Sequence, residues 1–248
     1  MLYQASQDRF DGIGEDRSTA ECLPGLADLC RLNGDEAYRK EGDLLMKVIG
    51  LTGGSGAGKG YVSGILTERG IPVLDTDRVS RSVCMPESRC LNELVHAFGS
   101  QILLPDGTYN RPFMAELVMN DGNRRRMLNR ITHRHILCEC RLWLDRCREN
   151  GFLAAVIDAP LLFESGFDRE CDAVIGVVAS DATRIDRIVM RDGISAEAAQ
   201  KRLAAQKNNA FYLEKCDEII YNEEGSSRRE LSERVDSVLD RLCISCRK

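Results

Sequence analysis

The sequence is poor in several features that mark particular classes of protein. Only 6% of its 248 residues are aromatic, only six are proline and only three are histidine. No apolar run reaches the ~18 residues that a membrane-spanning helix needs, so we expect no membrane span. The 34 basic residues are outnumbered by 39 acidic ones. A chain without a positive surplus has no electrostatic reason to bind nucleic acid or an anionic membrane.

What the sequence does contain is an ordinary globular composition. Hydrophobic residues make up 43% of the chain and charged residues 29%. This composition excludes a disordered, collagen-like or prion-like protein and is sufficient for a full core. The charge is unevenly placed: residues 1–45 hold ten acidic and five basic side chains, hence the whole net charge of −5, whereas residues 46–248 are neutral.

Residues 1–45 also differ from the rest in pattern. They are rich in turn residues and predict at most one short helix, around residues 26–32. Two interpretations remain open, a mobile extension or a mis-assigned start with Met46 as the true first residue. Under either one we expect no part in chemistry, since such tails are usually tolerated appendages. The functional domain is therefore predicted to span residues 46–245.

Eleven cysteines are scattered along the chain. An odd number without regular spacing, in a chain of this length, is a poor match to a secreted disulfide scaffold. Cys243 and Cys246 form a lone Cys-x-x-Cys pair, for which a metal or redox role stands against a plain reduced pair. The first 30 residues contain no basic stretch followed by an apolar one, so we expect no secretory signal. The predicted location is the cytoplasm.

From Met46 onward, short apolar runs alternate with helical stretches, among them a long charged helix over about 123–150. This order is typical of a parallel sheet with helices on both faces. We therefore predict an α/β fold of three layers. The five predicted strands are 48–51, 71–74, 153–157, 173–178 and 217–221.

A glycine-rich loop follows the first predicted strand. Residues 53–59 read Gly-Gly-Ser-Gly-Ala-Gly-Lys and fit the phosphate-binding pattern Gly-x-x-x-x-Gly-Lys, or P-loop. Glycines let successive N–H groups turn toward phosphate oxygens at a helix N-terminus, and Lys59 places a cation on the β and γ phosphates. The alternative, a glycine-rich turn with a solvated lysine, is disfavoured by the strand before the loop and the helix after it. We predict a P-loop NTPase-type fold that binds ATP through Gly54, Ser55, Gly56, Ala57, Gly58, Lys59, Gly60 and Tyr61.

One position departs from the P-loop pattern. The residue after the lysine is normally Ser or Thr, whose hydroxyl binds Mg²⁺, but here it is Gly60. Ser63 lies one helical turn further on, so we expect it to help only through water, which Mg²⁺ readily retains. We predict that Mg²⁺ with ATP is the cofactor and that no Ser or Thr binds the metal directly. Nucleotide binding should survive, while metal positioning is weakened.

Two aspartates, Asp75 and Asp77, follow the second predicted strand. The carboxyl ends of parallel strands line the ligand crevice, and an aspartate there can accept the proton of an attacking hydroxyl. The alternative is an N-cap for the helix that begins near Arg78. The residues leave this choice open, and the two carboxylates need not share a role.

Further motifs make residues 46–242 resemble the dephospho-CoA kinase family. The run Pro160-Leu-Leu-Phe-Glu164 after a buried strand, together with Asp75-x-Asp77, separates this family from other P-loop kinases better than the P-loop does. The resemblance implies ATP-dependent phosphorylation of the ribose 3′-hydroxyl of dephospho-CoA, which gives CoA and ADP in the last step of coenzyme A synthesis. The other matching segments are 49–54, 56–59, 131–133, 158–166 and 191–195, with Gln206 and Asn222.

The resemblance also implies roles for individual residues. Asp77 would be the general base for the ribose hydroxyl, and Lys59 would hold the β and γ phosphates. Arg187 and Arg191, four residues apart on one helix face, would belong to a lid over about 181–210 that closes on the transferring phosphoryl group. Without the resemblance, the alternative for these arginines is a solvated helix face. Asn222 is implied to contact adenine.

On the substrate side, the resemblance assigns the helical section over about 78–150 to dephospho-CoA. His133 is interpreted as structural or substrate-lining, because phosphoryl transfer depends on positioning and charge and needs no histidine. The predicted substrate-binding residues are Asp75, Asp77, His133, Leu161, Leu162 and Glu164.

Two other functions compete with this one. The first is another P-loop kinase that acts on a nucleoside or nucleotide. The second is a nucleotide-binding regulator whose catalysis is weakened because Gly60 removes a magnesium ligand. The preferred prediction is an enzyme that transfers a phosphoryl group to an alcohol, with ATP and dephospho-CoA as its partners.

Overall fold

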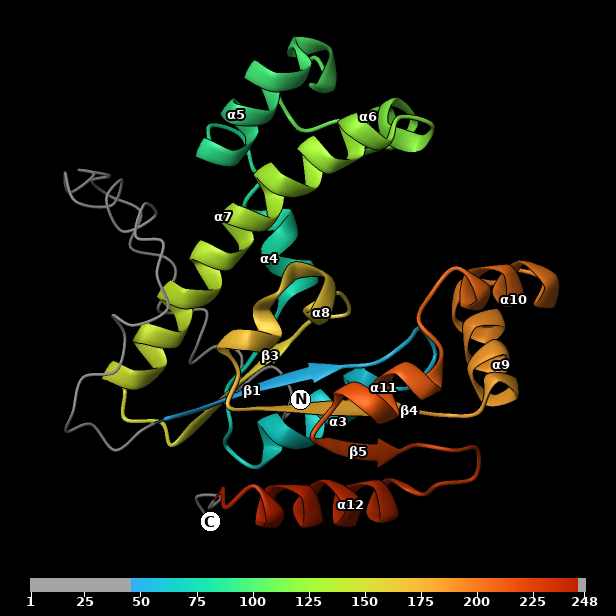
Figure 1. Ribbon diagram of the computed structural model, residues 1–248. Helices are drawn as coiled ribbons and strands as arrows, with labels where there is room; N and C mark the ends of the chain where they lie inside the picture. Colours follow the sequence, from blue (N-terminus) through green and yellow to red (C-terminus); the bar gives the residue numbers. More distant parts are fainter. Residues whose placement is uncertain (1–45, 245–248) are drawn as a thin grey trace. The chain divides into compact units, whose positions relative to one another are not determined.

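A computed structural model describes residues 46–244 of the chain (Figure 1). The short helix predicted around residues 26–32 and Cys246 lie outside these residues, and so does the contact, if any, between Cys243 and Cys246. No helix in this described stretch is long and apolar enough to cross a membrane.

The centre of the fold is a parallel sheet of five strands, in the order β2-β3-β1-β4-β5. The predicted α/β class and its five parallel strands are confirmed. The second strand begins at Val73, two residues later than predicted, because Pro72 has no N–H to donate; its carbonyl instead accepts a bond from Val156 N at 2.8 Å. The strands are β1 (Lys47–Thr52), β2 (Val73–Asp75), β3 (Ala154–Asp158), β4 (Ala173–Val178) and β5 (Glu218–Tyr221).

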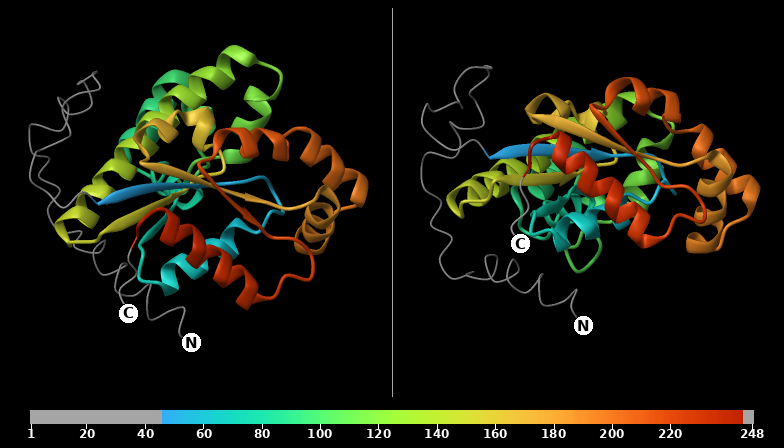
Figure 2. Two further views of the ribbon diagram at one scale, coloured as in Figure 1. Left: turned by 60° about the horizontal axis from the view of Figure 1, so that its bottom comes forward. Right: turned by 90° about the horizontal axis from the view of Figure 1, so that it is seen from below.

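Helices cover both faces of the sheet (Figure 2). Strand β1 shows why: Ile49 and Leu51 belong to the core cluster on one face, and Val48 to the cluster on the other. Alternate side chains of a strand point to opposite faces, so a strand with apolar residues on both sides needs two covering layers. On the side of Ile49 lie α3 (Lys59–Glu68) and α12 (Arg228–Arg241); on the other lie the end of α7 (Gly122–Glu149), α8 (Leu162–Ser165), the short 3₁₀ turn η2 (Phe167–Glu170) and α11 (Asn209–Lys215).

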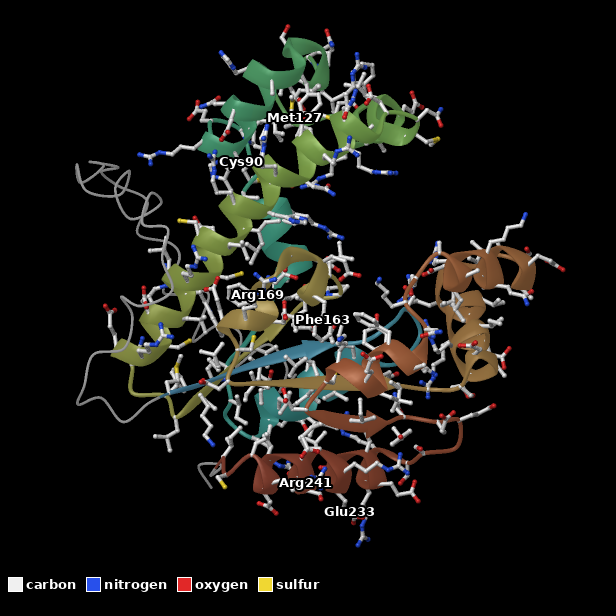
Figure 3. The ribbon with its side chains drawn as sticks, viewed as in Figure 1. Cys90, Met127, Phe163, Arg169, Glu233 and Arg241 are labelled. Carbon is white, nitrogen blue, oxygen red and sulfur yellow. The ribbon has the colours of Figure 1, made fainter. Side chains whose placement is uncertain are left out.

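A helical section stands between β2 and β3. Helix α7 is 28 residues long; its later residues Cys140 and Leu144 pack on the sheet, while Ile131 packs in a separate apolar cluster with the preceding helices. Cys90 and Met127 both lie in this outer part (Figure 3). The section comprises α4 (Thr76–Ser82), α5 (Arg89–Phe98), the 3₁₀ turn η1 (Ser100–Ile102), α6 (Arg111–Met119) and the first half of α7.

Two helices follow β4 and cover the region predicted as a lid. They are α9 (Asp181–Asp192) and α10 (Ala196–Ala204). Asp192, the last residue of α9, forms ion pairs with Arg191 of its own helix and with Arg202 of α10. This carboxylate therefore ties the two helices together at their joint.

Candidate active site

The P-loop connects β1 to α3 at the carboxyl edge of the sheet. Gly56 and Gly58 adopt φ of 78° and 90°, which L residues with a side chain rarely adopt. The first turn of a helix leaves its N–H groups without intrahelical partners. The amides that begin α3, at Lys59 and Gly60, are thus available to an anion, as the motif predicts.

The outer side of the P-loop is held by three side chains that donate to its carbonyl groups. Arg184, with 2% of its surface exposed, donates from Nε to Ser55 O at 3.0 Å. Asn222 donates from Nδ2 to Ala57 O at 2.8 Å, and Arg187 donates from Nη1 to Gly56 O at 3.2 Å. These three donors hold the loop from its carbonyl side, and Ala57 N is bonded within the loop to Gly54 O at 3.1 Å.

Gln206 contacts the same loop from the end of the predicted lid. Its Oε1 accepts from Ser55 N at 2.9 Å, and its Nε2 donates to Ser55 Oγ at 2.7 Å. Sequence reasoning quoted Gln206 only as part of a motif and passed over Arg184 entirely. The usable signal for Arg184 was its place one turn before Arg187 on the same helix.

Inside the loop, Lys59 forms an ion pair with Asp158. Asp158 ends β3 and is 5% exposed. Burial raises the pKa of this carboxyl, and the contacts with Lys59 and Ser63 oppose that rise. Ser63 donates to the second carboxylate oxygen at 2.6 Å. Sequence reasoning used Asp158 only to identify the family, although an acid at the end of a buried strand next to the P-loop strand was a direct signal.

The two aspartates after β2 have different roles. Asp75 pairs in register with Asp158 across β2 and β3, and its charge contributes to the raised pKa of Asp158. Its side chain caps α4 by accepting from Asp77 N at 2.8 Å. The N-cap alternative thus holds for Asp75. Asp77 stands in the first turn of α4 with its side chain exposed.

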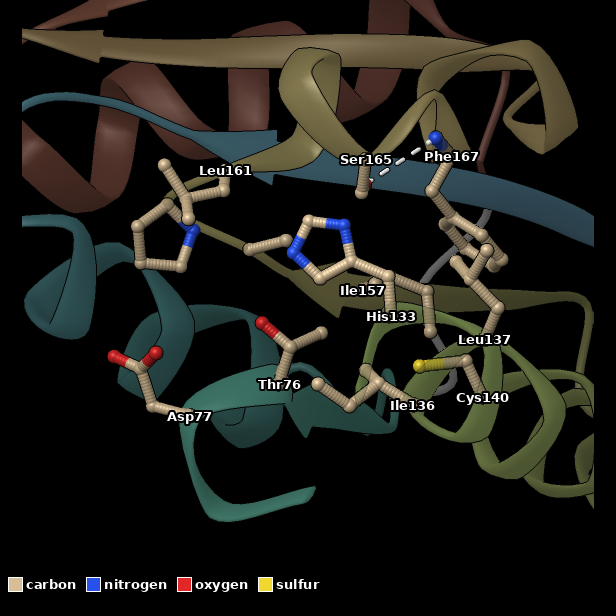
Figure 4. A pocket seen from close by; sticks show the side chains of 12 residues that line it. Thr76, Asp77, His133, Ile136, Leu137, Cys140, Ile157, Leu161, Ser165 and Phe167 are labelled. Atoms are coloured by element: carbon tan, nitrogen blue, oxygen red, sulfur yellow. Dashed lines mark hydrogen bonds between the residues drawn. The ribbon is translucent and has the colours of Figure 1, made fainter. Parts of the chain in front are cut away.

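Asp77 borders a mostly apolar pocket of about 90 Å³ (Figure 4). His133 projects into it from α7, and burial lowers the pKa of this imidazole; the ring is therefore neutral at pH 7. Leu161, 55% exposed, lies on the far wall from α7. The lining is completed by Thr76, Ile136, Leu137, Cys140, Ile157, Ala159, Pro160, Ser165 and Phe167.

The remaining predicted site residues lie apart from this pocket. Leu162 is fully buried against Gly50 of β1, so we correct its assignment from substrate contact to the core. Glu164 is exposed and does not line the pocket. Arg191 is directed to Asp192 rather than to the P-loop. Tyr61 is 68% exposed at the start of α3.

Comparisons with known proteins agree with this geometry. The family model described as dephospho-CoA kinase matches residues 47–228. The chain belongs to the dephospho-CoA kinase family. A dephospho-CoA kinase of Moorella thermoacetica is 42% identical over 177 residues, covering 71% of this chain and 83% of that relative. One of Oryza sativa subsp. japonica is 34% identical over 199 residues, covering 78% and 84%.

A solved dephospho-CoA kinase from Campylobacter jejuni shares the fold, with a TM-score of 0.60 at 22% identity over 80% of this chain and 98% of that one. The family match over residues 47–228 and the curated relatives confirm the predicted family, and membership in it implies ATP as a co-substrate. The alternative of a kinase from another P-loop family is set aside by the length of the match.

The donor set of this dephospho-CoA kinase family member fits a magnesium ion that arrives with ATP. Mg²⁺ in kinase sites takes one or two carboxylates together with substrate phosphates. Asp158 and Asp75 supply two carboxylates on neighbouring strand ends beside Lys59. Among residues 46–244, no group of three or more His, Cys, Asp or Glu side chains forms a closed metal cage.

Proposed function

We propose that this protein transfers the γ-phosphoryl group of ATP to the ribose 3′-hydroxyl of dephospho-CoA, giving CoA and ADP. The observation that carries the proposal is the junction of two sites at the carboxyl edge of the sheet. One is the P-loop with Lys59, and the other is the pocket bordered by Asp77. An exposed carboxylate at the border of a pocket, on the sheet edge that also carries the phosphate loop, is what an alcohol-phosphorylating kinase requires.

Each group of the site has a distinct part in the proposed transfer. The loop amides and the ammonium of Lys59 hold the β and γ phosphates. Asp158, with Asp75 beside it, would hold the metal ion, which neutralises phosphate charge when bound. Asp77 orients the ribose hydroxyl and accepts its proton as the new bond forms. Closure of the lid over the site would exclude water, which limits idle hydrolysis of ATP.

The arginines divide between two tasks in this proposal. Arg187 braces the P-loop from its carbonyl side. Arg191 reaches the transferring phosphoryl group only when the lid closes, because in the described conformation it is paired with Asp192. Asn222 holds Ala57 through Nδ2, and its proposed contact with adenine would use Oδ1.

We also propose that the reaction takes place in the cytoplasm. The support is the cysteine content, because eleven scattered cysteines without framework spacing do not match a secreted disulfide scaffold.

The direct test is product formation. Full-length protein is incubated with ATP, Mg²⁺ and dephospho-CoA, and CoA is identified by mass spectrometry. A panel of nucleosides and nucleotides is assayed alongside. Phosphorylation of a panel member with no conversion of dephospho-CoA would overturn the proposal.

Asp77→Asn tests the assigned base. Because general-base catalysis contributes typically 10²–10⁴-fold, we expect kcat to fall by about that factor while the affinity for ADP stays the same. Asp240→Asn, an exposed position on α12 far along the chain, serves as the matched control and should keep full activity. An Asp77→Asn enzyme that remains fast would move the base to another residue.

A further inference from the structure

The hydroxyl that the P-loop motif requires after its lysine is absent at Gly60. In P-loop proteins, this hydroxyl and an acid at a strand end act on the metal together. The acid is present here as Asp158. The question is therefore which group keeps that acid in position.

We propose that Ser63 supplies the missing hydroxyl one helical turn further along α3, as a positioning residue that fixes the carboxylate of Asp158. The inference rests on the proposed function. Ser63 Oγ donates to Asp158 Oδ2 at 2.6 Å, and Lys59 Nζ donates to Oδ1 of the same group. Each oxygen of this buried carboxylate is thus held by a different residue of one helix.

The choice between two acceptors supports this assignment. Ser63 Oγ also lies 3.2 Å from the carbonyl of Lys59, the usual back-bond of a serine inside a helix. A hydroxyl has one proton to donate, and bonds to a charged acceptor are shorter and stronger. The bond to Asp158 is the shorter by 0.6 Å. Ser63 is therefore committed to the carboxylate.

Two bonds to one carboxylate matter once ATP binds. The ammonium of Lys59 then belongs on the β and γ phosphates, and Oδ1 of Asp158 loses its partner. Without a second bond the carboxylate would be free to rotate. The Ser63 hydroxyl keeps Oδ2 in place, so Oδ1 still faces the P-loop, where a metal ion accompanying ATP is required.

The same helix offers matched variants. Thr67, one turn beyond Ser63, donates its hydroxyl to Ser63 O at 2.9 Å, the usual back-bond inside a helix, so Thr67→Ala removes a helical hydroxyl of the ordinary kind. A Cβ at Gly60 would meet no atom within 4 Å, so Gly60→Ser places a hydroxyl at the usual motif position without a clash.

The experiment measures the affinity of the full-length protein for ADP by calorimetry, with and without Mg²⁺. Removing an outer partner of a metal ligand costs about 10–100-fold in metal affinity. We therefore expect Ser63→Ala to reduce the Mg²⁺-dependent gain in ADP affinity about tenfold and to leave metal-free affinity unchanged. Ser63→Thr should keep most of the gain, and Gly60→Ser should restore it in the Ser63→Ala protein. Thr67→Ala should behave as wild type.

Several results would overturn the inference. They are a wild-type gain in Ser63→Ala, an equal loss with and without metal, no rescue by Gly60→Ser, or the same loss in Thr67→Ala. Thermal unfolding of each variant shows that the fold is retained. CoA formation by the wild type is scored separately: if it occurs while Ser63→Ala binds normally, only the role of Ser63 fails. If no CoA forms, the proposed function fails.

Discussion

Each P-loop glycine is fixed by a particular neighbour on the outer side of the loop. A methyl group at Gly58 would collide with the amide of Asn222, and one at Gly54 with the guanidinium of Arg184. The P-loop motif requires glycine so that the amides can turn toward phosphate. The structure adds a second reason, because the side chains of Arg184 and Asn222 occupy the space that a Cβ would need.

Gly58→Ala and Gly64→Ala form a matched pair within three turns of one another. Gly58 has φ of 90° and no room, so the alanine variant should displace the loop and lose ADP affinity in calorimetry. Gly64 lies inside α3, where an added Cβ would meet no atom within 4 Å. Its alanine variant should gain about 0.5–1 kcal/mol of stability in urea unfolding and keep its affinity. Equal ADP affinity in both variants would contradict this account.

For single residues, the sequence predicted which side chains belong to the site better than it predicted which residues they bond to. Lys59, Asp77 and the loop were predictable, since a motif or a strand end fixes their location. The different roles of Asp75 and Asp77 were not predictable, because the N-cap bond from Asp77 N to the Asp75 side chain depends on the local backbone. Nor was the pairing of Arg191, since its neighbour Asp192 competes for it. Leu162 was assigned to substrate because a motif does not reveal which of two adjacent leucines points into the core.

Between elements, the joint of α9 and α10 depends on one carboxylate. Hydrogen bonds from Arg191 and Arg202 lower the pKa of Asp192 to about 2. This folded value lies below the usual ~3.9 of an aspartate. The bonds therefore contribute fully above that usual value and are lost as the pH falls through about 2. Asp192 therefore stays ionised, and its ion pairs with Arg191 and Arg202 persist, over the near-neutral pH range in which kinases work.

The carboxyl resonance of Asp192 tests this joint. In ¹³C NMR its titration midpoint should lie near 2 in the wild type. Arg191→Gln removes the largest cause and should raise the midpoint toward the ordinary value, with Arg202→Gln giving a smaller rise. A midpoint unaffected by Arg191→Gln would show that the pair does not persist in solution.

The five strands and the long helix α7 were predictable from apolar periodicity, with ends displaced by at most two residues. The short helices were not. Helix α11 has only seven residues, too few for a repeating pattern, although Asn208 marks its start by accepting from Phe211 N at 3.1 Å. Its place is fixed by tertiary contact, since the ring of Phe211 packs edge-on against Phe163 of α8, with centroids 5.3 Å apart.

For the molecule as a whole, we expect residues 1–43 to be dispensable for catalysis. The described residues 46–244 belong to one compact unit, and the family match begins at residue 47. A chain lacking residues 1–43 should keep the unfolding midpoint and kcat/KM of the full chain. Met46→Ala is the contrasting change: Met46 is 6% exposed in the core, and its loss should cost about 2–5 kcal/mol in denaturant unfolding. A truncated chain with lower kcat/KM would give the extension a role.

The strand order has a consequence for biosynthesis. Strand β1 is made first, yet it lies between β3 and β4, and Leu51 pairs with Asp158 and Ile175. At about 5–20 residues per second of translation, the ribosome needs roughly 6–25 s to deliver both partners. During that interval the intervening helices can form early, because their contacts are local. Strand β1 is still unpaired along both edges. Strand β1 can therefore complete its pairing only after β4, which ends at Val178, has been made.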